Sequence, residues 1–154
     1  MDWFFELISN QFLIAGISSW AIAQVLKTII HAAIYKKIEW ERLFGDGGMP
    51  SGHSATVTSV ATMSALVCGF GSFEFAVTAI LAIIVCHDAM GVRLETGKQA
   101  VVLIEMIELI EALTKKDLPE TKLKEFVGHT PIQVAAGILI GIANASFLYY
   151  VIWA

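Results

Sequence analysis

Residues 12–35 read FLIAGISSWAIAQVLKTIIHAAIY, a run in which Lys27 is the only side chain with a fixed charge. A membrane-spanning helix needs about 20 mostly apolar residues, so this run predicts a transmembrane helix. Three further runs, at residues 51–71, 73–92 and 131–153, meet the same requirement. The sequence therefore predicts an all-α integral membrane helical bundle with about four spanning helices, in a single domain over residues 1–154.

The composition agrees with a membrane protein and excludes several other classes. Of the 154 residues, 56% are hydrophobic and 16% are charged, against roughly 25% charged in a soluble domain. The mean hydropathy is +0.71. These values exclude a disordered tail and a disulfide scaffold, and the net charge of −4 disfavours a nucleic-acid binder, which needs a basic face. Cys68 and Cys86 lie in apolar runs, and we interpret them as small hydrophobic residues. The first residues lack the positive region of a cleavable signal peptide, so we expect the first apolar run to stay in the mature protein.

A fifth apolar segment, residues 99–113, differs from the other four. Glu105, Glu108 and Glu111 recur every three residues and mark one side of a helix, while Val, Leu and Ile occupy the other. This pattern predicts an amphipathic helix. We expect it at the membrane interface or against the bundle, because carboxylates facing lipid are costly. Residues 114–125 and 36–49 are expected to be surface loops.

The cations predict the orientation of the chain. Nine of the ten Lys and Arg residues fall on one side of the membrane in this arrangement, namely Lys36, Lys37, Arg42, Arg93, Lys98, Lys115, Lys116, Lys122 and Lys124. The positive-inside rule makes that side cytoplasmic. We therefore expect both termini to lie outside. The small size and the absence of targeting signals favour an integral protein of a bacterial inner membrane.

Lys27 is the first candidate for chemistry, with Gln24 and His31 at helical spacing on either side of it. An ionisable residue within a spanning helix is expected to face the bundle interior or a cavity. The alternative is that its long stem reaches the interface by snorkelling.

The second candidate is the segment Gly-Gly-Met-Pro-Ser-Gly-His-Ser-Ala at residues 47–55. Pro and Ser are ordinary residues at a helix start. A helix N-terminus also binds anions through its free N–H groups, and Gly52 allows an anion to approach the backbone closely. A phosphate held by Ser51 and Gly52 would lie within reach of His53, which could exchange a proton with it.

Two further segments carry candidate residues. In residues 87–98, Arg93 has the planar fork that grips phosphate oxygens, unless it only anchors the helix at the interface. Asp88 could pair with Arg93 or Lys27, whereas His87 is interpreted as structural. In residues 128–133, His129 precedes a helix that Pro131 begins, and it is either part of a cap or a nucleophile at the mouth of a site.

Together, these segments resemble the type 2 phosphatidic acid phosphatase superfamily, which includes the vanadium haloperoxidases. The resemblance rests on Pro-Ser-Gly-His at 50–53 and His-Thr-Pro at 129–131. A longer pattern resembles the divergent branch of this superfamily, which consists of small membrane proteins. This pattern is Gly-Gly-Met-Pro-Ser-Gly-His, Asp-Ala-Met-Gly-Val-Arg and Gly-His-Thr-Pro, in this order. The chain departs from the superfamily in the first motif, where Lys27 and Arg42 are too far apart. It also departs in the third, where Leu123 stands in place of arginine and Gln133 in place of aspartate. Arg93 is the candidate replacement for the arginine.

The resemblance implies a metal-independent lipid phosphate phosphatase without a cofactor. His129 would attack phosphorus and form a phosphohistidine, and His53 would protonate the leaving group. Lys27, Arg93 and the backbone near Ser51 and Gly52 would hold the phosphoryl oxygens. Gln133, one turn beyond His129, could accept its ring N–H, and Asp88 is our candidate for stabilising the imidazolium.

The position of the site constrains the substrate. Residues 99–113 should not cross the membrane, so His53, Arg93 and His129 should share the cytoplasmic face. Such a site favours a two-tailed phospholipid, either phosphatidate or phosphatidylglycerol phosphate.

Three other functions remain open from the sequence. One is a vanadate-dependent peroxidase, and another is a metal hydrolase built from His31, His53, His87 and Asp88. The third is a binding or transport protein that keeps the fold without catalysis. The GxxxG pair Gly137 and Gly141 indicates close packing inside one bundle or, as the alternative, a homodimer interface.

Overall fold

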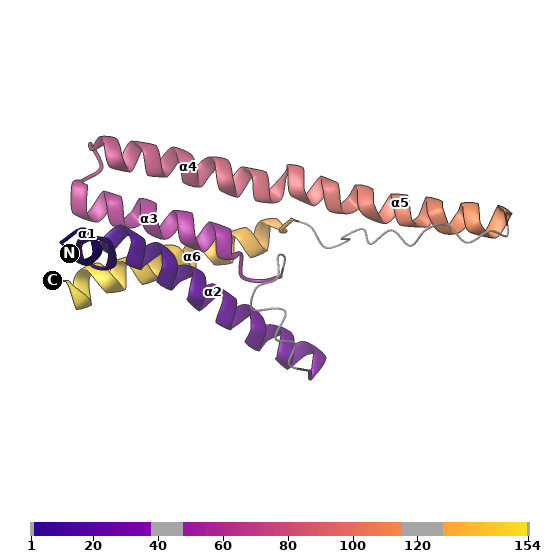
Figure 1. The fold of residues 1–154 in the computed structure, drawn as a ribbon, viewed down its shortest axis with the longest axis horizontal. Coiled ribbons are helices and arrows are strands. Elements are labelled where there is room, and N and C mark those ends of the chain that lie inside the picture. The colour runs from indigo at the N-terminus through magenta and orange to yellow at the C-terminus, as the bar shows by residue number, and fades with distance from the viewer. Residues whose placement is uncertain (1, 38–47, 115–127, 154) are drawn as a thin grey trace.

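The computed structural model describes residues 2–37, 48–114 and 128–153, and every regular element within these ranges is helical. The all-α prediction is therefore confirmed. The elements, shown in Figure 1, are α1 (Asp2–Ile8), α2 (Gln11–Tyr35), α3 (Gly52–Cys68), α4 (Phe73–Met90), α5 (Val92–Thr114) and α6 (Pro131–Phe147), which ends in the π-helical turn η2 (Leu148–Ile152).

Side-chain caps set where the long helices begin. Asn10 Oδ1 accepts hydrogen bonds from the N–H groups of Phe12 and Leu13 at the start of α2. Ser51 and Ser72 cap α3 and α4 through their hydroxyl oxygens. Each cap satisfies a backbone donor that has no partner inside the helix.

Helix α3 is the centre of the bundle and packs against α2, α4 and α6. Its contact with α6 depends on two glycines. A Cβ at Gly137 would collide with the Ser51 carbonyl oxygen, and one at Gly141 would lie 2.5 Å from the Ala55 carbonyl oxygen and 2.9 Å from Ser59 N. The pair therefore serves packing within one bundle, as favoured from the sequence.

Among the described residues, three helical stretches are long and apolar enough to cross a membrane: α2, the stretch through α4 and α5, and α6 with η2. The outward side chains of α2, α4 and α6 are large and apolar, as lipid contact requires. Helix α3 has 17 residues and a length of about 26 Å, slightly short of the roughly 30 Å hydrocarbon core. Of the four predicted spans, α3 is thus the shortest and is enclosed by the others (Figure 1).

Helix α5 differs from its predicted placement. It begins at Val92, earlier than expected, because Gly91 interrupts the chain for only one residue after α4. It then runs on nearly in line with α4 and projects beyond the other helices (Figure 1). Of its two predicted placements, at the interface or against the bundle, the second is not observed, since the main contact of α5 among the described helices is with α4. The expected loops, residues 36–49 and 114–125, fall mostly outside the described residues.

Adding a methyl group at the glycine contact should destabilise the bundle. We expect Gly141→Ala to lower the free energy of unfolding by about 1–3 kcal/mol, the usual cost of overpacking, because backbone atoms of α3 occupy the space. Thermal unfolding of the detergent-solubilised protein measures this change. Gly71→Ala is the matched control, since nothing lies within 4 Å of a Cβ there. Equal melting temperatures for the two variants would contradict the packing role.

Candidate functional site

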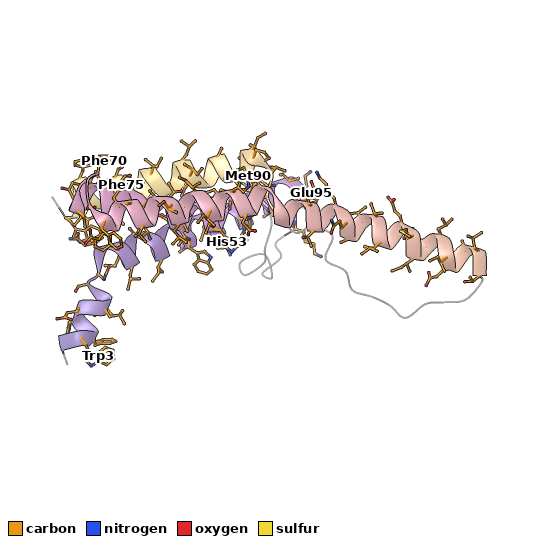
Figure 2. All side chains as sticks on the ribbon, turned by 90° about the horizontal axis from the view of Figure 1, so that it is seen from above. Trp3, His53, Phe70, Phe75, Met90 and Glu95 are labelled. Atoms are coloured by element: carbon orange, nitrogen blue, oxygen red, sulfur yellow. The ribbon has the colours of Figure 1, made fainter. Side chains whose placement is uncertain are left out.

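The fold brings His53 and His129 together at one end of the bundle. His53 lies in the first turn of α3, and His129 lies two residues before α6 begins. Their ring centroids are 6.2 Å apart and the ring planes are inclined by 59°. In Figure 2, His53 lies towards the end of the bundle from which α5 projects.

His129 is held on both its backbone and its ring. Its N–H donates to the Ala89 carbonyl oxygen at 2.9 Å, which ties it to the last turn of α4. Its side chain is 4% exposed, and Nδ1 lies 3.3 Å from Gln133 Oε1. The ring therefore has a fixed position at the junction of α4 and α6.

The partner of Nδ1 determines which nitrogen of the neutral ring carries the proton and which carries the lone pair. Gln133 Oε1 also accepts the Thr130 N–H at 3.0 Å as part of a capping box. Because a backbone N–H can only donate, the amide atom facing it must be oxygen. Nδ1 of His129 is then the donor in its own contact with this oxygen. In the neutral ring, Nε2 consequently carries the lone pair.

Gln133 also connects the two histidine segments through its backbone. Its carbonyl oxygen accepts the Ser51 N–H at 3.0 Å. Ser51 is fully buried, and its Oγ accepts the Ser54 N–H at 3.3 Å and the Ser54 hydroxyl at 3.0 Å. In the first turn of α3, this leaves the N–H groups of Gly52 and His53 without partners inside the helix. Such donors favour an anion.

Helix α2 contributes a cation and an amide beside this turn. Lys27 is 6% exposed, so its stem does not snorkel outward. Instead it packs against Gly48, where a Cβ would lie 3.3 Å from Lys27 Cγ. Gln24 is 7% exposed, and its Oε1 is a buried oxygen without a hydrogen-bond partner in the described part of the chain. This oxygen lies 3.8 Å from the position of a Cβ at Gly52.

The other candidate residues are placed less completely. Asp88 is half-buried in the last turn of α4, next to the Ala89 carbonyl that holds His129. Arg93 is the second residue of α5, at the same end of the bundle, but its side chain lies outside the described residues, as does all of Arg42. His87 is exposed.

The metal-hydrolase alternative has no ligand cluster in the described ranges. No three His, Cys, Asp or Glu side chains there gather where they could hold an ion. His31, one of the four residues in that alternative, stacks on Tyr35 with a centroid distance of 4.5 Å.

Sequence reasoning did not anticipate the roles of Gln24 and Trp20. Trp20 Cδ1 would lie 3.4 Å from a Cβ at Gly52, so the Trp20 indole packs beside the N-terminus of α3. The spacing of Ile17, Trp20, Gln24 and Lys27, three or four residues apart, places all four on one side of α2. This spacing is the feature of the sequence that could have predicted that Trp20 and Gln24 lie beside the site together with Lys27.

The tautomer of His129 can be measured directly. In protein with ¹⁵N-labelled histidine, we expect Nδ1 of His129 to be protonated and Nε2 unprotonated at a pH where the ring is neutral. Gln133→Ala should remove this preference, because the acceptor for Nδ1–H is lost. The His129→Asn variant identifies the resonance by its disappearance. A protonated Nε2 in the wild-type protein would contradict the assignment.

Comparisons with known proteins agree with the motifs. The sequence profile of the Divergent PAP2 family matches residues 8–144, which include all three blocks quoted above. The uncharacterized membrane protein YuiD of Bacillus subtilis (strain 168) is 39% identical over 154 residues, covering 94% of this chain and 98% of the relative. No solved structure matches the chain significantly.

Proposed function

This chain belongs to the Divergent PAP2 family, and on that premise we propose that it hydrolyses a phosphomonoester on a membrane lipid. The observation that carries the proposal is the pairing of His53 and His129, 6.2 Å apart between their ring centroids, beside the N-terminus of α3. One phosphoryl group between the rings could meet a nucleophile on one side and a proton donor on the other. The reaction needs no metal or other cofactor.

His129 is the proposed nucleophile. Nε2, which carries the lone pair of the neutral ring, attacks phosphorus while the bond from phosphorus to the lipid oxygen breaks, which leaves a phosphohistidine. Protonated His53 gives its proton to the leaving alkoxide. Neutral His53 then takes a proton from water as the water oxygen attacks phosphorus. The phosphorus–nitrogen bond breaks, and inorganic phosphate and free His129 are released.

The surrounding groups would stabilise the negative charge on the phosphoryl oxygens. The N–H groups of Gly52 and His53 point out of the helix start, and buried Lys27 supplies a positive charge beside it. Arg93 is the proposed second cation. Gln24 Oε1 needs a donor, which a protonated phosphate oxygen or a headgroup hydroxyl can provide.

Asp88 is the proposed partner of the positive charge that develops on the histidines. Gln133 fixes the orientation of His129, but a neutral amide cannot balance an imidazolium as a carboxylate does. Asp88 lies beside the residue whose carbonyl anchors His129, so it is the acidic residue best placed for this role among the described ones.

The substrate proposal rests on where the site lies. The histidines sit at the ends of apolar helices, at the level expected for lipid headgroups. By the positive-inside rule, this end faces the cytoplasm of a bacterial inner membrane. Phosphatidate and phosphatidylglycerol phosphate are the proposed substrates.

Loss of the nucleophile tests the proposal. We expect purified protein to release phosphate from phosphatidate or phosphatidylglycerol phosphate in the presence of EDTA. His129→Ala should lower the rate at least about 10³-fold, because the covalent route is removed. His31→Ala is the matched control and should retain activity. If the folded wild-type protein releases no phosphate from any lipid, the proposal is wrong.

Replacement of the carboxylate tests the role of Asp88. We expect Asp88→Asn to lower kcat about 10²-fold or more, since the charge that balances the imidazolium is lost while the shape is kept. Glu95→Gln is the control, because Glu95 forms an exposed ion pair with Lys98, at 2.6 Å. Unchanged turnover in Asp88→Asn would refute the role.

A non-catalytic lipid-phosphate binding or transport protein is the second candidate. Gln133, at the position where the superfamily pattern has aspartate, favours it. Binding would depend on Lys27 and the α3 N-terminus and would survive the loss of His129. Catalysis would be lost with His129.

A further inference from the structure

An apolar groove on the side of the bundle continues from the proposed site. It encloses about 370 Å³ between α2, α3 and α4, and is lined by Ile17, Trp20, His53, Thr56, Val57 and Val85. His53 is the one ionisable side chain in this lining. The groove and the candidate site therefore meet at His53.

The lining descends from the site towards the middle of the bundle. Helix α3 runs away from the site, so Thr56 and Val57 lie about one turn deeper than His53. Helix α2 runs towards the site, so Ile17 lies about 15 Å along the helix from Lys27. This length is about half of the roughly 30 Å hydrocarbon core, the depth of one leaflet.

One side of α2 changes from polar to apolar along that length. Lys27 and Gln24 are buried beside the start of α3, whereas Trp20 is 40% exposed and Ile17 is 63% exposed along the groove. A ligand lying on this side of α2 would therefore place a polar end near Lys27 and an apolar end near Ile17. Trp20, which adjoins both Gly52 and the groove, lies at the transition. Amphipathic aromatic rings favour such boundaries.

The groove offers little to a polar occupant. Thr56 is the one hydroxyl in its lining, and its Oγ1 already donates to the Gly52 carbonyl oxygen at 2.8 Å. The remaining lining, apart from His53, consists of the hydrocarbon of Ile17, Val57 and Val85 and the Trp20 indole. A pocket of this kind favours hydrocarbon.

We infer that the groove holds one acyl chain of the lipid whose phosphate reaches His53 and His129. This inference rests on the proposed function and deepens it. The enzyme would select lipids by chain as well as by phosphate, with Ile17, Trp20 and Val57 as the residues that contact the chain. Each methylene buried there strengthens binding roughly fourfold.

Photo-crosslinking tests the position of the chain independently of turnover. The probe is phosphatidate with a diazirine in one acyl chain, in nanodiscs of phosphatidylcholine. We expect adducts concentrated on α2 and α3 residues of the groove, and few on the lipid-facing Ile80 and Ile83 of α4. A phosphatidylcholine probe with the same diazirine should label the groove weakly. Equal labelling by both probes, or adducts spread evenly over the outer surface, would overturn the inference.

Filling the groove tests its effect on the substrate. We expect Ile17→Trp to raise KM for long-chain phosphatidate about tenfold, the equivalent of nearly two methylenes. Val57→Phe is a second variant that reaches the groove from α3. Ile83→Trp is the control, since Ile83 lies on the exposed side of α4.

The outcomes separate the two proposals. Specific labelling of the groove without phosphate release from any substrate would sink the phosphatase proposal and keep the lipid site. Phosphate release with an unchanged KM in both groove variants would support the phosphatase proposal and overturn the acyl-chain site, because the enzyme would then act on the lipid without using the groove.

Discussion

The contact between the starts of α3 and α6 is the constraint on which the rest of the structure depends. The hydrogen bond from Ser51 N–H to the Gln133 carbonyl joins the two segments. Gly137 and Gly141 then let the α6 backbone lie directly against α3. A larger residue at either position would push α6 outward, and the distance between His53 and His129 would grow with it. The geometry of the site thus depends on the absence of two side chains in the membrane interior.

Polar contacts hold α2 to this pair of helices. Ser59 of α3 donates to the Ala15 carbonyl oxygen of α2 at 2.9 Å. Asn144 of α6 donates to the hydroxyls of Ser18 and Ser19 at 2.8 Å each. Within lipid, apolar burial adds little to helix association, so small residues and hydrogen bonds between helices carry more of it. This explains why the central helix is rich in Ser, Thr and Ala rather than in large apolar residues.

The same bundle separates two environments along α2. Towards the site, α2 presents buried Lys27 and Gln24 to the start of α3, and deeper in the bundle it presents Trp20 and Ile17 to the groove. A lipid phosphate has the same division between a charged head and an apolar chain. The proposed activity and the proposed acyl site therefore use one continuous surface.

The sequence by itself determined the fold class, the approximate positions of the four apolar helices and the family. Apolar length alone identifies α2, α4 and α6, because lipid requires backbone groups to be paired within a helix. Ser51 and Thr130 cap α3 and α6. Because Ser and Thr are common N-cap residues, the sequence alone can predict where these two helices begin. The motif residues His53 and His129 could be singled out, since Pro-Ser-Gly-His and His-Thr-Pro are local patterns.

Only the tertiary structure decided how these parts meet. Periodicity gave α5 an amphipathic character but not its direction, which follows from the one-residue break at Gly91. The hydrogen bond from Ser51 N–H to the Gln133 carbonyl oxygen and the groove beside His53 arise between helices that are distant in the chain. The same is true of the place of Gln24 Oε1 beside Gly52, where this oxygen has no hydrogen-bond partner among the described residues. Hydropathy and spacing record which residues prefer lipid or a helix face. They carry no information on which faces pack together, because that depends on the shapes of several helices at once.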